Sequence, residues 1–338
     1  MDLPLRTERL VIRTLEPRDL DAFVAYRTDP DIGRYQDWAL PYTLEAARSL
    51  FDRQAALTGP TDGEGVQLAI EYGGEIVGDL YVELRHGGDI AVLGYTLSTA
   101  HQGKGFATEA VTRLVDALVD DGVHRIVATL DPENVPSMRV LEAIGFTFES
   151  FAPKAEFVRG EWVDDLRYSL LAEDRVAWRT RSLVTPDVVR FVEITPDEAY
   201  LWGRLKTHHS QESYVATMPL TFRDALFPEV IDGAPVVPWM RGVMGDDERV
   251  GFVMIAEVTA HHPEPYLWRL LVDRMHQRRG IGTRILAELC AMLRDQGHAT
   301  LLTSWGEGPG SPRPFYERFG FVPTGRQIDD ETEARLTL

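Results

Sequence analysis

An internal repeat is the feature of this chain that most limits its fold. The stretch HQGKGFATEA returns 175 residues later in altered form as HQRRGIGTRI. From Gln102 in the first stretch to Gly145 of a downstream Gly-Phe pair is 43 residues, and from Gln277 to Gly320 in the second is also 43. Self-similarity at a fixed offset indicates a duplicated structural unit. The sequence therefore predicts two diverged copies of one domain.

The length of the chain agrees with a duplicated domain. Its 338 residues, 44% of them hydrophobic, exceed what one hydrophobic core usually holds and suit two domains of about 170 residues each. We expect a first domain over 1–174, a linker over 175–189 and a second domain over 190–338.

The same order of elements is predicted in each copy. In the first, a strand (ERLVIRTL) and two helices (PRDLDAFVAYR and TLEAARSLFDRQAAL) precede a β-hairpin, VQLAIEYGGEIVGDLYVEL, whose counterpart is PWMRGVMGDDERVGFVMIAEV. Each hairpin has one glycine early in its second strand, Gly78 or Gly251. A strand, the glycine turn, a long helix, a strand, a short helix and a closing hairpin follow. Apolar residues recur at helical spacing in the long helices: Val111, Leu114, Val115, Leu118, Ile285, Leu286, Leu289 and Leu293.

This order predicts an α/β fold in each copy, with a mixed, mainly antiparallel sheet flanked by helices.

Charge and composition exclude several classes of partner. The formal net charge of −18 repels nucleic acid and favours cationic partners. No apolar run reaches the roughly 20 residues of a membrane helix, and the N-terminus lacks a signal-peptide pattern. We therefore expect a cytoplasmic protein without membrane contact.

The single cysteine, Cys290, lies in a helical pattern and fits a buried residue. The histidine pairs lack the spacing of a zinc site, so no metal is expected.

The repeated glycine turn predicts an anion site. A strand enters the turn, the glycines allow a tight bend and a helix begins at once. Backbone amides from Gly103 to Thr108 then converge at a helix N-terminus, where the helix dipole favours phosphate or pyrophosphate. Neither a P-loop nor a dinucleotide-binding fingerprint is present. A structural turn with no ligand is the alternative.

The turns QGKGFA and QRRGIG resemble the Gln/Arg-x-x-Gly-x-Gly/Ala signature of the GNAT superfamily of N-acetyltransferases, which also places a helix and a Gly-Phe pair downstream. This resemblance implies two GNAT folds in tandem, with acetyl-CoA as cofactor and its pyrophosphate on the glycine turn. It also implies that the pantetheine arm lies along the backbone of Leu97 and Val272, each five residues before the signature glutamine. The implied cofactor-binding residues of the turns are Gln102, Gly103, Lys104, Gly105, Phe106, Ala107 and Thr108, and Gln277, Arg278, Arg279, Gly280, Ile281, Gly282 and Thr283.

The first copy resembles the branch that acetylates the N-termini of ribosomal proteins, through TERLVIRTLEPRD, DPENVPSMRVLEAIGF and EFVRGEWVDDLRYSLL. By that resemblance, Asn134 and Ser137 contact the pantetheine arm and sulfur, and Glu156 is the general base.

The second copy resembles polyamine and diamine acetyltransferases, through QESYVATM, YLWRLLVDRMHQRRGIGTRIL and PFYERFGFVPTG. The resemblance implies that Tyr316 is the acid that protonates the leaving thiolate. The first copy has Leu141 at this position and cannot use the same acid. Pro309 stands where the family has an asparagine, which implies a lost contact to the pantetheine arm.

The general base of the second copy stays open between Glu257, Asp273 and Glu331. An amine with a pKa of about 10.4 must lose a proton, and a carboxylate near its usual pKa of about 4.3 accepts it only if burial raises that pKa or a relay carries the proton. Among seven tryptophans, Trp38, Trp162, Trp239 and Trp268 are candidates either for cation–π contact with an ammonium group or simply for packing.

Three functional hypotheses follow. The first is transfer of acetyl from acetyl-CoA to a primary amine of a small polycation, such as a polyamine, an aminoglycoside or a basic peptide antibiotic, the last two implying antibiotic resistance. The second is N-terminal acetylation of a protein. The third makes one copy a non-catalytic module that binds acetyl-CoA or supports its neighbour. Because single GNAT domains often pair, the copies are expected to form an intramolecular pseudo-dimer, within a monomer or a homodimer.

Overall fold

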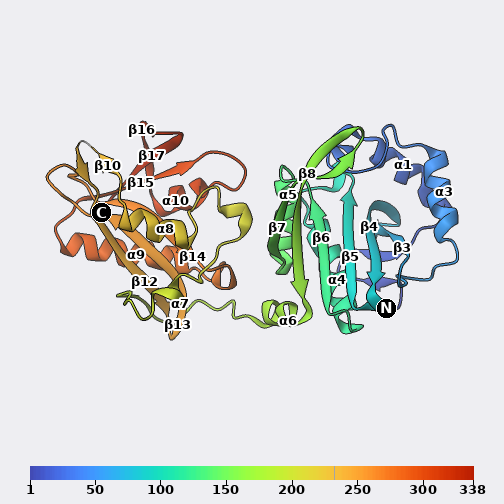
Figure 1. Cartoon of the computed structure of the whole chain (residues 1–338), viewed down its shortest axis with the longest axis horizontal. Helices are drawn as coiled ribbons and strands as arrows, with labels where there is room; N and C mark the ends of the chain where they lie inside the picture. Colours follow the sequence, from blue (N-terminus) through green and yellow to red (C-terminus); the bar gives the residue numbers. More distant parts are fainter. Residues whose placement is uncertain (232) are drawn as a thin grey trace. The chain divides into compact units, whose positions relative to one another are not determined.

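The computed structural model describes residues 1–231 and 233–338. It divides the chain into two compact units, Met1–Thr180 and Arg181–Leu338, and each unit has its own sheet (Figure 1). The α/β prediction of helices on mixed sheets is confirmed in both units.

The first unit is built on an eight-stranded sheet in the order β1-β2-β3-β4-β5-β6-β8-β7. Neighbouring strands are antiparallel except for the parallel pair β5 and β6. The strands are β1 (Leu5–Arg6), β2 (Val11–Thr14), β3 (Gly65–Tyr72), β4 (Glu75–Arg85), β5 (Ile90–Leu97), β6 (Arg125–Leu130), β7 (Thr147–Val158) and β8 (Glu161–Leu171). The helices are α1 (Leu20–Thr28), α2 (Pro30–Gly33), α3 (Leu44–Gln54), α4 (Phe106–Asp120), α5 (Val135–Ile144) and α6 (Ala172–Thr180), with short 3₁₀ segments η1 (Pro17–Asp19), η2 (His86–Gly88) and η3 (Thr99–His101).

The second unit repeats this strand order when its sheet is read from β9 to β16, without a counterpart of β1. Its seven-stranded sheet runs β16-β17-β15-β14-β13-β12-β9, and β14 and β15 are its parallel pair. The strands are β9 (Val189–Val192), β12 (Pro238–Gly245), β13 (Glu248–Ala256), β14 (Tyr266–Val272), β15 (Thr300–Gly306), β16 (Val322–Ile328) and β17 (Glu331–Thr337), with a separate pair β10 (Val230–Ile231) and β11 (Ala234–Pro235). The helices are α7 (Ala199–Trp202), α8 (Met218–Leu226), α9 (Ile281–Asp295) and α10 (Arg313–Phe319), with 3₁₀ segments η4 (His209–Gln211) and η5 (Arg274–His276).

In both units the parallel strands are joined for only a short distance. Strands β5 and β6 pair from Ile90 to Val92 and then lose their register, although β5 continues to Leu97. Strands β14 and β15 pair only at Tyr266 and Leu302. The carboxyl ends of each pair therefore separate, and a glycine turn follows the end of β5 and of β14.

The long helix after each turn covers its sheet with the predicted apolar residues. In α4, Val111, Leu114 and Val115 are fully buried, as are Ile285 and Leu289 in α9. The remaining predicted positions, Leu118, Leu286 and Leu293, are also buried. The helical periodicity is confirmed because each apolar stripe faces a sheet.

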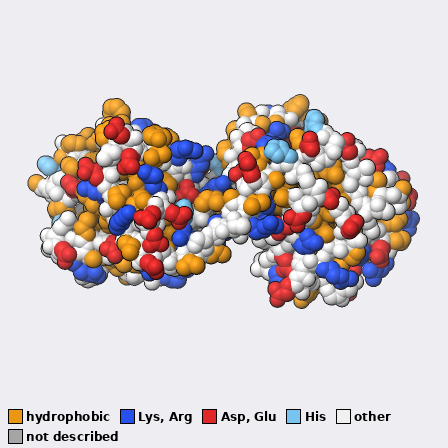
Figure 2. Space-filling model, turned by 90° about the horizontal axis from the view of Figure 1, so that it is seen from below, with side chains coloured by type: hydrophobic (Ala, Val, Ile, Leu, Met, Phe, Trp, Pro, Cys, Tyr) orange, Lys and Arg blue, Asp and Glu red, His pale blue; other side chains and the backbone are white. Residues whose placement is uncertain are grey.

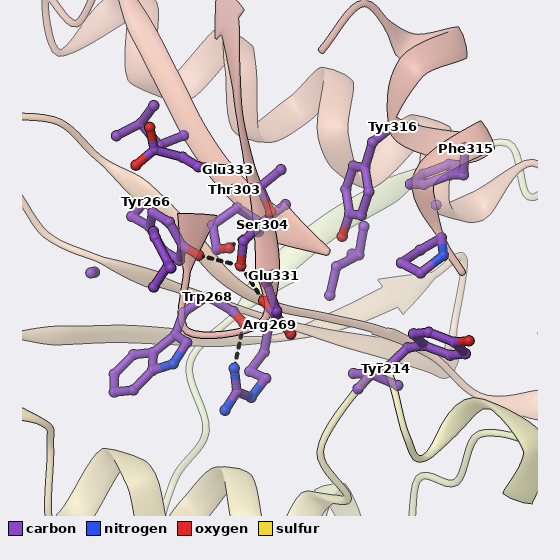
Figure 3. A pocket seen from close by; sticks show the side chains of 18 of the residues that line it. Tyr214, Tyr266, Trp268, Arg269, Thr303, Ser304, Phe315, Tyr316, Glu331 and Glu333 are labelled. Atoms are coloured by element: carbon purple, nitrogen blue, oxygen red, sulfur yellow. Dashed lines mark hydrogen bonds between the residues drawn. The ribbon is translucent and has the colours of Figure 1, made fainter. Parts of the chain in front are cut away.

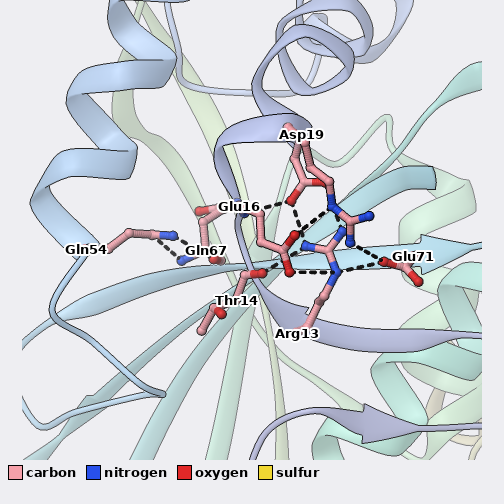
Figure 4. Close-up of polar contacts among 8 residues, drawn as sticks. Arg13, Thr14, Glu16, Asp19, Gln54, Gln67 and Glu71 are labelled. Carbon is pink, nitrogen blue, oxygen red and sulfur yellow. Dashed lines mark hydrogen bonds and ion pairs between the residues drawn. The ribbon is translucent and has the colours of Figure 1, made fainter. Parts of the chain in front are cut away.

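An ion cluster joins the first strands of the first unit to η1 (Figure 4). Both terminal nitrogens of Arg13 donate to the Asp19 carboxylate, at 2.7 and 2.9 Å, and its Nε donates to Glu71 at 2.8 Å. Burial would raise the pKa of Asp19, but the bonds from Arg13 and from the Glu16 amide outweigh it and lower the pKa. The cluster holds β2, η1 and β3 together.

The observed boundary between Thr180 and Arg181 lies within the expected linker over 175–189. Helix α6 extends into it and packs on the first unit. Arg175 donates to Asp116 at 2.8 Å and to the Ile144 carbonyl at 2.7 Å, and both Arg175 and Trp178 are buried.

In the view of Figure 2, acidic and basic side chains are both scattered over the surface of each unit. None of the helices in residues 1–231 and 233–338 combines the length and apolar character needed to cross a membrane.

Gly78 and Gly251 occupy the same place in the two units. Gly78 lies opposite Leu97, the last residue of β5, and Gly251 lies opposite Val272, the last residue of β14. A Cβ atom added at Gly78 would lie 2.3 Å from the Thr96 carbonyl oxygen, and one added at Gly251 would lie 2.5 Å from that of Leu271. Only glycine allows the strands to approach this closely.

This contact predicts that Gly78→Ala destabilises the first unit by about 2 kcal/mol, because the added methyl group must push β4 and β5 apart. Gly94→Ala is the matched control in the same strand pair, since its Cβ would meet nothing nearer than Tyr81 Cβ at 3.5 Å. We expect the control to change stability by less than about 1 kcal/mol. Chemical denaturation of the full chain measures both, and equal effects would contradict the close approach.

Candidate functional site

The two glycine turns have the same backbone shape. Gly103 (φ 72°) and Gly105 (φ 79°) adopt the left-handed conformation in the first turn, and Arg278 (φ 67°) and Gly280 (φ 73°) do so in the second. Arg278 therefore takes a conformation that favours glycine, which is a local strain retained at this position. Each turn ends on a glycine N-cap, after which α4 or α9 begins.

These turns present free backbone donors at the N-terminus of a long helix. Gly105 and Gly280 provide no side-chain cap, so the first amide groups of α4 and α9 point out of the helix without an internal partner. The helix dipole adds partial positive charge at the same place. Nothing lies within 4 Å of where a Cβ would stand on Gly103, so a ligand can approach the backbone closely. The geometry fits an anionic ligand such as a pyrophosphate.

The signature glutamine ties each turn to the strand before it. The side-chain Nε2 of Gln102 donates to the Leu97 carbonyl at 3.1 Å, and that of Gln277 donates to the Val272 carbonyl at 3.1 Å. The carbonyls expected to meet the pantetheine arm thus each accept one bond from the turn. A carbonyl has a second lone pair that remains for a ligand.

The basic residues at the two turns make different contacts within the protein. Arg9, which sequence analysis missed, donates to the Lys104 carbonyl at 3.0 Å, and its guanidinium lies 4.5 Å from the centre of the Phe106 ring. In the second unit the Arg279 side chain is buried and donates to the Val184 carbonyl at 2.7 Å, whereas Arg278 is exposed. Arg279 therefore holds the turn in place, and Arg278 is the arginine open to an anion.

The first unit gathers hydroxyl groups at the start of α5. Asn134 caps this helix by accepting from the Ser137 amide at 3.2 Å. The Tyr95 hydroxyl, on β5, lies 2.7 Å from the Ser137 hydroxyl, and burial raises the pKa of Tyr95 above its usual range. Leu141 is fully buried in the core. Sequence analysis missed Tyr95 because only the fold brings β5 against α5.

Two carboxylates of the first unit, Glu156 and Asp165, differ in how deeply they are buried. Glu156 lies exposed on β7, whereas the amine chemistry calls for a partly desolvated carboxylate. Asp165 on β8 meets that condition. Burial first and the negative charge of Glu156 second raise the pKa of Asp165 to about 6. The sequence signal for Asp165 was weak, because its strand carries charges at several neighbouring positions.

A large cavity in the second unit connects the glycine turn to the reaction residues predicted there (Figure 3). Its volume is about 1080 Å³, enough for a cofactor-sized ligand. The predicted cofactor residues that line it are Val272, Gln277, Arg278, Gly280, Ile281, Gly282 and Thr283, and Arg279 does not. Tyr316 and Trp268 line the same cavity.

Tyr316 lies on α10 with its hydroxyl directed into this cavity (Figure 3). Its ring stacks on Trp305 at 5.8 Å between centroids, with an interplanar angle of 10°. Burial raises the pKa of Tyr316 above its usual range, and a hydrogen bond with Thr303 opposes this only in part. The hydroxyl is therefore protonated at neutral pH and available as a donor.

The three candidate carboxylates of the second unit have different surroundings. Asp273 caps η5, accepting from the Met275 and Lys206 amides at 2.9 Å each. Glu257 is exposed and does not line the cavity. Glu331 lines the cavity and accepts a hydrogen bond from Ser304, which in turn accepts one from Tyr266 at 2.6 Å. Position alone therefore favours Glu331.

Pro309 and the other tryptophans have structural contacts. The Pro309 carbonyl accepts from the Tyr214 hydroxyl at 3.0 Å, which anchors the loop before α10. Trp38 and Trp239 lie under Arg27 and Arg241, at 4.2 and 4.6 Å from ring centre to guanidinium. Trp162 is exposed near the end of the β7–β8 hairpin.

Among the described residues, no group of three or more His, Cys, Asp and Glu side chains is placed to hold a metal ion.

Comparisons with known proteins match each unit separately. A family model described as "Acetyltransferase (GNAT) domain" matches residues 9–147, and one described as "Acetyltransferase (GNAT) family" matches residues 202–321. The chain is 30% identical over 175 residues to a Bacillus licheniformis protein named uncharacterized N-acetyltransferase p20, which covers 50% of this chain and 97% of that protein. It is 32% identical over 83 residues to the [ribosomal protein uS5]-alanine N-acetyltransferase of Escherichia coli, covering 24% of this chain and 43% of that enzyme.

One similar solved structure is Mycobacterium smegmatis RimJ in complex with CoA-disulfide. It is 27% identical, covers 51% of this chain and 87% of that chain, and has a TM-score of 0.45.

The raised pKa of Asp165 predicts a pH-dependent stability of the first unit. Because the folded state holds this proton more tightly than the unfolded state, ionisation above about pH 6 destabilises the fold. Asp165→Asn should therefore stabilise the unit at pH 8 by about 1 kcal/mol, allowing for solvent screening, and the gain should shrink as pH falls through 6 and vanish below about 4. Denaturation at several pH values measures this.

Asp164→Asn is the control, because Asp164 faces the Lys154 amide and ammonium instead. An equal gain in both variants, or a gain independent of pH, would contradict the assignment to Asp165.

Proposed function

The chain belongs to the GNAT acetyltransferase family, with one GNAT domain in each unit, and from this premise we propose that it acetylates a primary amine of a small polycationic acceptor. It is an N-acetyltransferase and its cofactor is acetyl-CoA. The acceptor is assigned to the cavity of the second unit. The continuity of this cavity, from the glycine turn to acidic residues of β17, is the observation that carries the proposal.

The residues of the second unit fit the cofactor. The uncapped N-terminus of α9 and the exposed Arg278 suit its pyrophosphate, and the free side of β14 between the turn and Tyr266 suits its pantetheine arm. Acetyl-CoA, when bound, supplies an activated acetyl thioester. Tyr316 would give a proton to the leaving sulfur, since its hydroxyl is directed into the cavity.

The far end of the cavity suits a cation. Carboxylates predominate on the β16–β17 turn and on β17, where Asp329, Asp330, Glu331 and Glu333 line the wall. Tyr214 adds an aromatic face, which attracts ammonium groups, and Trp268 adds another, although the Arg269 guanidinium already lies 5.5 Å from the centre of its ring. The net charge of −18 increases the local concentration of polycations. These features together favour a polyamine or an amino-sugar over a neutral amine.

A panel of acceptors tests the proposal. Thiol release from acetyl-CoA is followed with spermidine, 1,4-diaminobutane, an aminoglycoside and a peptide with a free N-terminal alanine. We expect kcat/KM for at least one small polycation to exceed that for the peptide by roughly tenfold or more. Acetylation of the peptide alone would overturn the proposal in favour of N-terminal acetylation of a protein.

Tyr316→Phe should lower kcat by roughly 100-fold with the accepted amine, because the leaving thiolate loses its proton donor. The dissociation constant for CoA should change less than about twofold, since the hydroxyl is not needed for ground-state binding. Thiol release and calorimetry measure the two quantities.

Tyr200→Phe is the control, a tyrosine of the same unit that is exposed and does not line the cavity. Unchanged turnover in Tyr316→Phe would show that Tyr316 is not the acid. Tyr95 of the first unit would then be the next tyrosine to test.

A further inference from the structure

Three side chains from three strands form one hydrogen-bonded chain in the cavity of the second unit (Figure 3). The Tyr266 hydroxyl, at the start of β14, donates to Ser304 Oγ on β15 at 2.6 Å. The Ser304 hydroxyl donates to Glu331 Oε2 at the start of β17. Both protons thus point toward the carboxylate.

This direction defines what can bind at the open end. The Tyr266 proton is used toward Ser304, so the phenol oxygen offers only lone pairs to a ligand. Glu331 Oε1 has no hydrogen bond among the described residues, and Glu331 has no ion pair there. The end of the chain that faces the cavity is therefore all acceptor, and its natural complement is a cationic N–H donor.

Two neighbouring carboxylates, Glu333 and Glu264, differ from Glu331 because each already lies near an arginine of the protein. Glu333 accepts from Thr324 at 2.7 Å and lies 3.7 Å from Arg326. Glu264 pairs with Arg335 at 2.8 Å. Glu331 is thus the partly buried carboxylate of this wall whose charge is left for a ligand.

We infer that Tyr266, Ser304 and Glu331 receive the acceptor's ammonium group and carry one of its protons to the Glu331 carboxylate. This assignment rests on the proposed acetylation of an amine in the second unit. It selects one carboxylate from the three that the sequence left open.

The proton transfer balances along the chain. The ammonium nitrogen gives a proton to the Tyr266 oxygen, whose own proton passes to Ser304, and the Ser304 proton passes to Glu331. The ammonium becomes a neutral amine with a free lone pair, the carboxylate becomes a neutral carboxyl group, and both hydroxyls are restored. No oxidant or other reactant is needed.

The surrounding charges are compatible with this role. Burial raises the pKa of Tyr266 to about 12, and the nearby negative charges of Glu331 and Glu333 also raise it. Tyr266 therefore stays protonated and passes a proton only as another arrives. Arg269, on the same strand, is paired with Asp224 at 3.0 Å, and Tyr316 on α10 faces the group from the other side.

Binding of spermidine to the full chain, measured by calorimetry at pH 7 without cofactor, tests the ammonium seat. Glu331→Gln should weaken binding by roughly tenfold or more, because it removes the charge and keeps the shape. Glu257→Gln is the matched control, an exposed glutamate outside the cavity, and should bind like the wild type. Normal binding by Glu331→Gln, or no binding by the wild type, overturns the inference.

The pH dependence of kcat/KM for spermidine tests the proton path. Between about pH 6 and 9 the wild type should vary weakly, because it captures the ammonium form and deprotonates it. Glu331→Gln should rise about tenfold per pH unit, because it depends on the scarce neutral amine. Tyr266→Phe should show the same steep rise while binding spermidine within about threefold of wild type, since Glu331 keeps its charge.

The two proposals can fail separately. If the wild type acetylates spermidine and Glu331→Gln has the same pH profile, the proton path is overturned and the acetylation stands. If Glu331→Gln loses binding but the wild type acetylates no amine, the ammonium seat stands and the proposed acetylation fails. The thermal unfolding midpoint of each variant is compared with that of the wild type. Equal midpoints exclude unfolding as the cause of the changes.

Discussion

One hydrogen bond, made twice, fixes the geometry on which the rest of each unit depends. The signature glutamine donates from its side chain to the carbonyl five residues earlier, Gln102 to Leu97 and Gln277 to Val272, at 3.1 Å in both. This bond closes the turn onto the end of its strand. The following helix therefore begins beside the point where the parallel strands separate, and its free amides face the same space. A helix N-terminus with free amides is thereby placed beside an opening in the sheet.

The two units keep this geometry and differ in the groups placed around it. In the first, Tyr95 and Ser137 meet at the start of α5, and Leu141 is buried in the core. In the second, the residue aligned with Leu141 is Tyr316, whose hydroxyl faces the cavity. The two units share the backbone shape of the turn, while their side chains differ in the hydroxyl groups placed beside it.

Much of the candidate site could be predicted from local patterns. The glycine turns, the amphipathic helices and Gly78 and Gly251 follow from short-range spacing, because each depends on the conformation of a few neighbouring residues. Arg9, Asp165 and Ser304 could not be found this way. Arg9 reaches the turn from more than ninety residues away, and the role of Asp165 depends on burial that its own strand does not encode.

By itself, the sequence determined that one domain occurs twice, that each copy carries a glycine turn before a helix, and that Tyr316 has no counterpart in the first copy. These properties are local or repeat at a fixed offset, so they can be recognised in the sequence without the fold. Only the tertiary structure distinguishes Glu257, Asp273 and Glu331, because of these three only Glu331 lines the cavity. Sheet order brings β14, β15 and β17 side by side and so places Ser304 between Tyr266 and Glu331. Such contacts join residues far apart in the chain, and hydrogen-bond direction and burial exist only once those strands are paired.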